Sequence, residues 1–143
     1  MAREVRHSVF IRAAPRAIYD LFATAAGLDS WFTTGAEVEA RRGGRIVYRW
    51  KNWGPEHVTT EAVGEVREAN PPGRFVFDWD SADERPTTVE MDFEAVDGGT
   101  VMRLREFGFS GGARGEQALA REASGWGEAM TLAKFRVEHG LRY

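Results

Sequence analysis

Residues 115–141 read GEQALAREASGWGEAMTLAKFRVEHGL, and the rest of the chain can be interpreted from them. Apolar residues recur in this segment at intervals of three or four, at Leu119, Ala123, Trp126, Met130, Ala133 and Val137. On an α-helix this spacing forms one stripe, and the remaining surface carries Glu116, Glu122, Glu128, Lys134 and Glu138. The pattern predicts a helix long enough to cross the whole domain, so the preceding residues must form a surface that covers its stripe.

Length and composition limit the class of protein. The chain has 143 residues, so we expect a single domain over residues 1–143 with its own core. The net charge of -3 disfavours nucleic acid or an anionic membrane as a partner, and the lack of cysteine excludes disulfides and thiolate chemistry. Residues 1–22 contain no continuous apolar run, and no later segment is apolar enough to span a membrane, so we expect a cytoplasmic protein without a signal peptide.

The middle of the chain alternates apolar and polar residues, which is typical of strands with one buried face. Strands are predicted over residues 4–11, 36–41, 45–53, 59–69, 75–79, 89–95 and 101–107. After the first of them, a short helix is predicted to begin at Pro15 and to end at Gly27, with a further helical turn over residues 28–32. Strands and helices are thus segregated along the chain, which indicates an α+β fold.

The last two predicted strands form a hairpin whose register has two solutions. A loop at residues 97–98 places Asp92 opposite Arg103, whereas a loop at residues 98–99 places Glu94 opposite Arg103. Both registers pair acids with arginines on one face and apolar residues on the other. An antiparallel sheet with one solvated face needs a cover on its other face, and the C-terminal helix is predicted to supply it.

Short motifs along nearly the whole chain give a resemblance to a known family. They are Ala14-Pro15 before Ile18-Tyr19, Trp31-Phe32, Gly43-Gly44, Gly64-Glu65-Val66, Pro71-Pro72, Phe75 to Trp79, Gly98-Gly99-Thr100, Gly108-Phe109 and Gly125-Trp126. In this order the chain resembles the helix-grip (SRPBCC) superfamily of START domains and the birch pollen allergen, and within it the bacterial relatives of the activator of heat-shock protein 90 ATPase. The resemblance implies a curved antiparallel sheet of about six to seven strands wrapped around a long C-terminal helix, with two short helices after the first strand.

The resemblance also implies a cavity between sheet and helix that binds a hydrophobic or aromatic small molecule. Twelve residues are predicted to face it: Trp31, Tyr48, Trp50, Phe77, Trp79, Met91, Phe93, Met102, Leu104, Glu106, Trp126 and Met130. An aromatic-lined space with a few polar groups is the usual form of such a site, although large aromatic residues also fill ordinary cores. No catalytic residue or cofactor is predicted. A metal site is not expected either, because His7, His57 and His139 lie far apart in the sequence and there is no cysteine.

Glu106 is the one charged residue among these twelve, and two interpretations of it remain open. Alternation along its strand carries it to the inward side with Met102 and Leu104, where it would orient a ligand or bond a Tyr or Trp. Otherwise the strand ends or bulges before Glu106, which then reaches solvent, because an unpaired buried carboxylate is costly.

Two other classes of function remain as alternatives. A chaperone-regulating protein of the stress response would need an exposed apolar or strongly charged patch. A cyclase-like enzyme would need an acid–base pair inside the cavity, for which Glu106 and Tyr48 are the candidates. Phe135 lies opposite Trp126 on the predicted helix and is expected to be exposed or to contact a second copy of the chain in a homodimer.

Three sharper motifs are interpreted as structural. Residues 108–112 match the nucleophile-elbow pattern G-x-S-x-G, but no Asp follows residue 97 and a triad is not expected. Residues 111–115 are predicted to be a flexible connector into the helix. The acidic residues within 78–84 are predicted to form a solvated hairpin tip, because they lack the glycine and terminal glutamate of a calcium loop.

Overall fold

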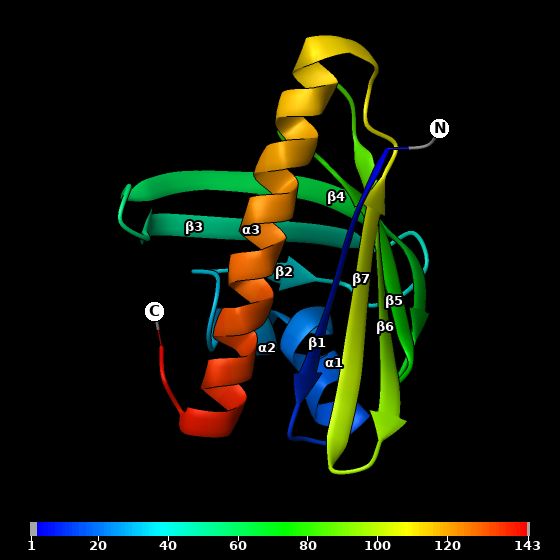
Figure 1. The fold of residues 1–143 in the computed structure, drawn as a ribbon, viewed down its shortest axis with the longest axis vertical. Helices are drawn as coiled ribbons and strands as arrows, with labels where there is room; N and C mark the ends of the chain where they lie inside the picture. The colour runs from blue at the N-terminus through cyan, green and yellow to red at the C-terminus, as the bar shows by residue number, and fades with distance from the viewer. Residues whose placement is uncertain (1–2, 143) are drawn as a thin grey trace.

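The computed structural model describes residues 3–142, and its elements follow the predicted order (Figure 1). They are β1 (Glu4–Ile11), α1 (Pro15–Ala23), α2 (Ala25–Asp29), β2 (Glu37–Val38), β3 (Arg45–Trp53), β4 (Val58–Asn70), β5 (Arg74–Trp79), β6 (Thr87–Val96), β7 (Gly99–Phe107) and α3 (Gly112–His139). The prediction of an α+β helix-grip fold, with two short helices after the first strand and one long helix at the end, is confirmed.

Within residues 3–142, seven strands form one antiparallel sheet in the order β1-β7-β6-β5-β4-β3-β2. In the β6–β7 hairpin Asp92 lies opposite Arg103 and Val96 opposite Gly99, so the loop lies at residues 97–98. The first of the two predicted registers is therefore correct. Gly98 has a φ of +82°, a left-handed conformation that a tight turn of this kind requires and that glycine adopts without strain.

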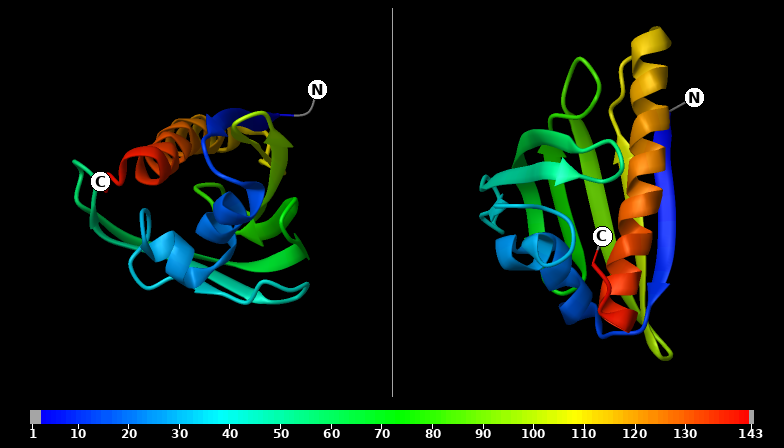
Figure 2. Two further views of the ribbon diagram at one scale, coloured as in Figure 1. Left: turned by 90° about the horizontal axis from the view of Figure 1, so that it is seen from below. Right: turned by 90° about the vertical axis from the view of Figure 1, so that its left-hand side faces the viewer.

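The sheet curves around the two short helices, and α3 closes its open side (Figure 2). α3 packs along the edge strand β1. The Lys134 ammonium donates a hydrogen bond to the carbonyl oxygen of Phe10 at 2.6 Å, and a carboxylate oxygen of Glu138 accepts one from the backbone N–H of Arg12 at 3.0 Å. Lys134 and Glu138 therefore hold the end of the helix on β1, whereas the sequence placed them on a purely solvated face.

α3 turns a slightly different face toward the sheet from the one predicted. Its buried residues are Gly115, Ala118, Trp126, Ala129, Met130 and Ala133. Ala123 is exposed, so its place in the predicted stripe is wrong, and Glu122 takes the inward position one turn before Trp126. At about 100° per residue, Glu122 lies roughly 40° to one side of Trp126 and Ala123 roughly 60° to the other. The spacing alone does not choose between them.

Two predicted boundaries are also wrong. The first helix ends at Ala23, and Gly27 lies inside α2. The reason is Thr24, which has an extended backbone and caps α2 by accepting a hydrogen bond from the N–H of Gly27 at 2.9 Å. α3 begins at Gly112, so residues 112–115 form its first turn and are not a connector.

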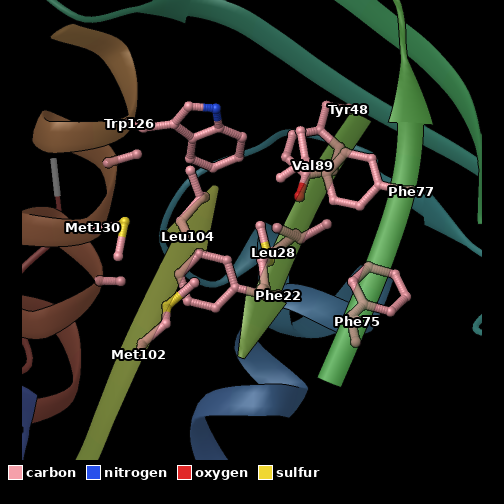
Figure 3. Packing of buried hydrophobic residues seen from close by; sticks show 14 of the residues in the cluster. Phe22, Leu28, Tyr48, Phe75, Phe77, Val89, Met102, Leu104, Trp126 and Met130 are labelled. Atoms are coloured by element: carbon pink, nitrogen blue, oxygen red, sulfur yellow. The ribbon is translucent and has the colours of Figure 1, made fainter. Parts of the chain in front are cut away.

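The core lies between the inner face of the sheet and the helices (Figure 3). In this view Trp126 and Met130 of α3 lie on the side of Leu104 and Met102 of β7, and Phe22 of α1 lies between Leu104 and Met102. The alternation of β7 thus delivers its apolar residues to α3, as the sequence predicted.

Candidate functional site

A pocket of about 270 Å³ opens between α3 and the β3–β4 end of the sheet. Aromatic and apolar groups dominate its walls, and three charged residues of α3 stand at its helical side. The lining consists of Phe32, Trp50, Trp53, Val58, Thr60, Trp79, Arg121, Glu122, Gly125, Trp126 and Glu128. Its volume is close to the lower end of the roughly 300–1,000 Å³ range of small-molecule sites.

Phe32 organises one aromatic wall of the pocket. Its ring meets Trp50 edge-on with centroids 5.3 Å apart, and Trp53 edge-on at 5.6 Å. Behind it, Trp31 stacks on Phe32 at 4.6 Å and donates its indole N–H to the carbonyl oxygen of Leu21 at 3.2 Å. Edge-to-face and stacked pairs of this kind fix ring orientations, so this wall is rigid before any ligand arrives.

Trp79 of β5 and Trp126 of α3 form the opposite wall, where sheet and helix meet. Their ring centroids are 5.4 Å apart with the planes inclined by 31°. Both indole N–H groups point at the same carboxylate, that of Glu106 on β7. Trp79 Nε1 lies 3.1 Å from Glu106 Oε2, and Trp126 Nε1 lies 2.8 Å from Glu106 Oε1.

Glu106 is fully buried, with 0% of its surface exposed. Regular pairing with Val89 continues through this position, so β7 neither ends nor bulges before it. The interpretation that Glu106 reaches solvent is therefore wrong, and the interpretation that it bonds a Trp is correct. The Thr87 hydroxyl donates a third hydrogen bond to Glu106 Oε2 at 2.5 Å. Three donors thus satisfy both oxygens of this buried carboxylate.

Glu122 of α3 lies against Glu106 and is the second acid of the site. Burial, the negative charge of Glu106 and a hydrogen bond between the two carboxyl groups raise the pKa of Glu122 to about 8. The backbone N–H of Ala82 donates to Glu122 Oε1 at 3.4 Å, and the charge of Arg121 opposes the shift. The raised pKa favours the protonated form of Glu122, whose O–H donates the hydrogen bond to Glu106.

The loop between β5 and β6 is held against the segment that connects β7 to α3. Both oxygens of Asp83 accept hydrogen bonds from Ser110, one from the backbone N–H and one from the hydroxyl, each at 2.6 Å. Arg85 donates to the carbonyl oxygens of Gly108 and Phe109 at 3.0 and 3.1 Å. Asp83 is buried, so its assignment to a solvated tip is wrong. These bonds fix the loop that presents Ala82 to Glu122, and they engage the serine of the nucleophile-elbow pattern.

Tyr48 stands behind the pocket. Its ring lies 6.0 Å from Phe32, 5.7 Å from Trp50 and 5.1 Å from Trp79, measured between centroids. Its hydroxyl is buried and bonds to none of the residues 3–142, and burial raises the pKa of Tyr48 above its ordinary value. A phenol held in its neutral form is a poor general base, so the predicted Glu106–Tyr48 acid–base pair gains no support from this arrangement.

The twelve predicted site residues divide into two groups. Trp50, Trp79 and Trp126 line the pocket, and Glu106 lies directly behind the two indoles. The other eight are packed in the core: Trp31, Tyr48, Phe77, Met91, Phe93, Met102, Leu104 and Met130. The sequence thus identified the inward faces of the strands, whereas the open space occupies only one end of the interior that those faces enclose.

Several residues of the pocket were missed by the sequence prediction. Glu122 was assigned to the solvated face of α3, and Trp53 and Val58 belong to the β3–β4 hairpin, whose position depends on the curvature of the sheet. Phe32 could have been identified from the sequence, because it follows Trp31 in one of the motifs that carry the family resemblance. Residues 3–142 bring no three His, Cys, Asp or Glu side chains together in an arrangement that suits a metal ion.

Fold and pocket together define the class of protein: an α+β helix-grip domain with a small aromatic pocket under its C-terminal helix. The chain belongs to the family of Activator of Hsp90 ATPase homolog 1-like proteins, whose model matches residues 12–136. No curated protein matches the sequence. Among the described residues, no helix combines the length and apolar character that a membrane crossing requires.

Solved structures share this fold at low sequence identity. The Aha1 dimer from Colwellia psychrerythraea is 20% identical, with a TM-score of 0.77 over 96% of this chain and 97% of that one. The AHSA1-like protein from Aeromonas hydrophila is 19% identical, with a TM-score of 0.77 over 96% and 93% of the two chains. DynU16, from the dynemicin biosynthetic locus, is 16% identical, with a TM-score of 0.81 over 100% of this chain and 51% of its own.

Proposed function

We propose that this protein binds a small hydrophobic, aromatic molecule in the pocket under α3, without converting it. The observation that carries the proposal is the aromatic wall of Phe32, Trp50, Trp79 and Trp126 around about 270 Å³ of space. Rigid aromatic surfaces with few polar groups bind planar apolar molecules well, because little side-chain entropy is lost on binding. We expect binding to take place in the cytoplasm.

Two other features support a binding role. Gly125 lines the pocket and leaves the helix surface open there, since a Cβ built on it would meet no atom within 4 Å. The structural relative DynU16 comes from a biosynthetic locus, which is compatible with a fold that handles small organic molecules. A chaperone partner is not favoured, because ion pairs balance the charge on the outer face of the sheet.

We also propose that the chain forms a homodimer. The relative from Colwellia psychrerythraea is described as a dimer, and Phe135 on the outward side of α3 is 42% exposed in this chain. Burial of such a residue against a second copy would remove apolar surface from water.

The binding proposal is tested by filling the pocket. The Cβ of Gly125→Phe meets no atom within 4 Å, and we expect its ring to enter the open space, so the fold should persist and the ligand should be excluded. The probe is N-phenyl-1-naphthylamine, an uncharged dye whose fluorescence rises in apolar surroundings. We expect one saturable site per chain in the parent and at least tenfold weaker binding in Gly125→Phe.

Ala123→Phe is the matched control, because Ala123 is exposed on the same helix and does not line the pocket. It should bind the dye as the parent does. If the dye binds Gly125→Phe as tightly as Ala123→Phe, the pocket is not the binding site and the proposal fails.

A further inference from the structure

The charges around the pocket are unequal in sign. Glu122 and Glu128 line it, and Glu106 lies behind its indole wall, whereas Arg121 is the one basic residue of the lining described here. Arg121 and Glu128 are both exposed at the rim, so water screens them. Inside, the acidic groups are Glu106 and Glu122, and with Glu122 protonated they carry one negative charge between them.

The aromatic walls add to this negative character. The face of an indole or phenyl ring carries negative quadrupole potential, and cages of several rings are the usual recognition device for quaternary ammonium groups. Phe32, Trp50, Trp79 and Trp126 bring four aromatic rings to the pocket from four different segments of the chain. Trp79 and Trp126 each donate their N–H to Glu106, which places the carboxylate behind the aromatic wall.

We propose that the pocket selects small organic cations, in which an ammonium group is attached to an apolar or aromatic body. The ammonium would lie among the rings beside Glu122, and the apolar body would extend toward Phe32 and Trp50. This inference rests on the proposed function, since it names the class of ligand that the same pocket takes.

Binding of a cation has a consequence for the shared proton. Without ligand, Glu122 is protonated and its O–H donates a hydrogen bond to Glu106, because two carboxyl groups side by side are not readily both ionised. A positive charge beside Glu122 favours its ionised form, so the O–H bond of Glu122 breaks and the proton passes to solvent. The pair then carries two negative charges against the one positive charge of the ligand, and the ligand itself is chemically unchanged.

The groups around Glu122 allow this exchange. From β7 it faces Glu106, from the β5–β6 loop it faces the backbone N–H of Ala82, and on α3 it has Arg121 and Glu128 as charged neighbours in the pocket lining. The β3 and β4 residues of the lining are Trp50, Trp53, Val58 and Thr60, and they contribute no ionisable acid or base. Glu122 is therefore the group whose ionisation we expect to respond to a bound cation.

A pair of isosteric probes tests the inference. Phenyltrimethylammonium and tert-butylbenzene have nearly the same shape and differ by one positive charge. Calorimetric titrations at pH 7 in two buffers of different ionisation enthalpy give the affinity and the number of protons released. We expect the cation to bind at least tenfold more tightly than its uncharged isostere and to release close to one proton. Glu122→Gln should abolish the release and most of the preference for the cation.

Failure of the inference is distinguishable from failure of the proposed function. Equal affinities for the two probes would overturn the selection of cations and leave the pocket as a binding site. Preferential binding of the cation without proton release would overturn the ionisation of Glu122. If neither probe nor N-phenyl-1-naphthylamine binds the parent protein, the binding function itself is wrong, and the inference falls with it.

Discussion

Glu106 is the residue on which the polar part of the site depends. A buried carboxylate is costly unless it is paired or hydrogen-bonded, and here two indole N–H groups and one hydroxyl meet that requirement. Its inward direction could be predicted from the alternation of its strand. Its partner Glu122 could not, because the helical spacing admits either Glu122 or Ala123 on the inner face, and an apolar residue seemed the natural choice.

Glu122 should make the stability of the protein depend on pH. Its pKa rises from an ordinary value of 4.5 to about 8, so between these values the folded protein binds a proton that the unfolded chain has lost. The contribution of this group to the free energy of unfolding is therefore fully present below pH 4.5 and is lost as the pH rises toward 8. At about 1.4 kcal/mol per pKa unit, the loss amounts to a few kcal/mol.

Glu122→Gln removes this titration. We expect its free energy of unfolding, relative to the parent, to be more favourable at pH 8.5 than at pH 5 by a few kcal/mol. Urea denaturation at the two pH values measures the difference. Glu116→Gln, on an exposed part of the same helix, is the control and should show no such change. A constant offset between Glu122→Gln and the parent at both pH values would show that Glu122 is ionised normally.

The helix α3 stabilises the fold and also forms one wall of the pocket. Trp126 contributes to both. Trp126→Ala should lower the free energy of unfolding by about 3–5 kcal/mol, as truncation of a buried aromatic residue does. Trp126→Phe keeps an aromatic ring but leaves Glu106 Oε1 without its 2.8 Å donor, which should cost about 1–3 kcal/mol. Urea denaturation at pH 7 measures both.

Phe135→Ala is the control on this helix, because a largely exposed side chain contributes little to folding. Its effect should stay within about 0.5 kcal/mol. An effect of Trp126→Ala as small as that of Phe135→Ala would mean that the inner face of α3 has been assigned incorrectly.

The other elements show which parts of the architecture can be predicted from local sequence patterns. The strands of the middle region follow from the alternation of apolar and polar residues. Alternation and turn residues also limit the register of β6 with β7 to two possibilities, one of which is observed. The boundary between α1 and α2 does not, because it depends on Thr24 preferring to cap the next turn over continuing the first helix. Packing decides between such nearly equal local conformations, and the spacing of apolar residues in the sequence does not reveal that packing.

At the scale of the whole molecule, the two faces of the sheet have different partners. The outer face carries ion pairs that balance its charge: Arg105 with Glu4 at 2.8 Å and with Glu90 at 3.0 Å, and Arg103 with Glu94 at 3.0 Å. Each pair contributes little to stability, but together they balance the charge along these strands, so the outer face offers no strongly charged surface there. This is why a chaperone docked on the outer face is not favoured.

The position of the pocket is set by the curvature of the whole sheet. It exists because the β3–β4 hairpin, carrying Trp53 and Val58, curves back toward α3 (Figure 1). Sheet curvature arises from the summed twist of many residues, with an irregular pairing between Trp50 and Trp53 in the hairpin itself. The sequence therefore predicted which residues point inward, but not where the interior stays open.

The outward side of α3 gives the last prediction, which concerns assembly. Phe135 is 42% exposed and lies on the helix face that packs against neither the sheet nor the pocket. If two copies associate through this face, Phe135→Glu places two carboxylates at an apolar contact and should convert the dimer to a monomer while leaving the melting temperature of the isolated domain nearly unchanged. Sedimentation equilibrium of the parent and Phe135→Glu measures the masses, and Glu116→Lys serves as a charge-changing control far along the same helix. A parent protein that remains monomeric at high concentration, or a Phe135→Glu variant that remains dimeric, would refute an interface at this residue.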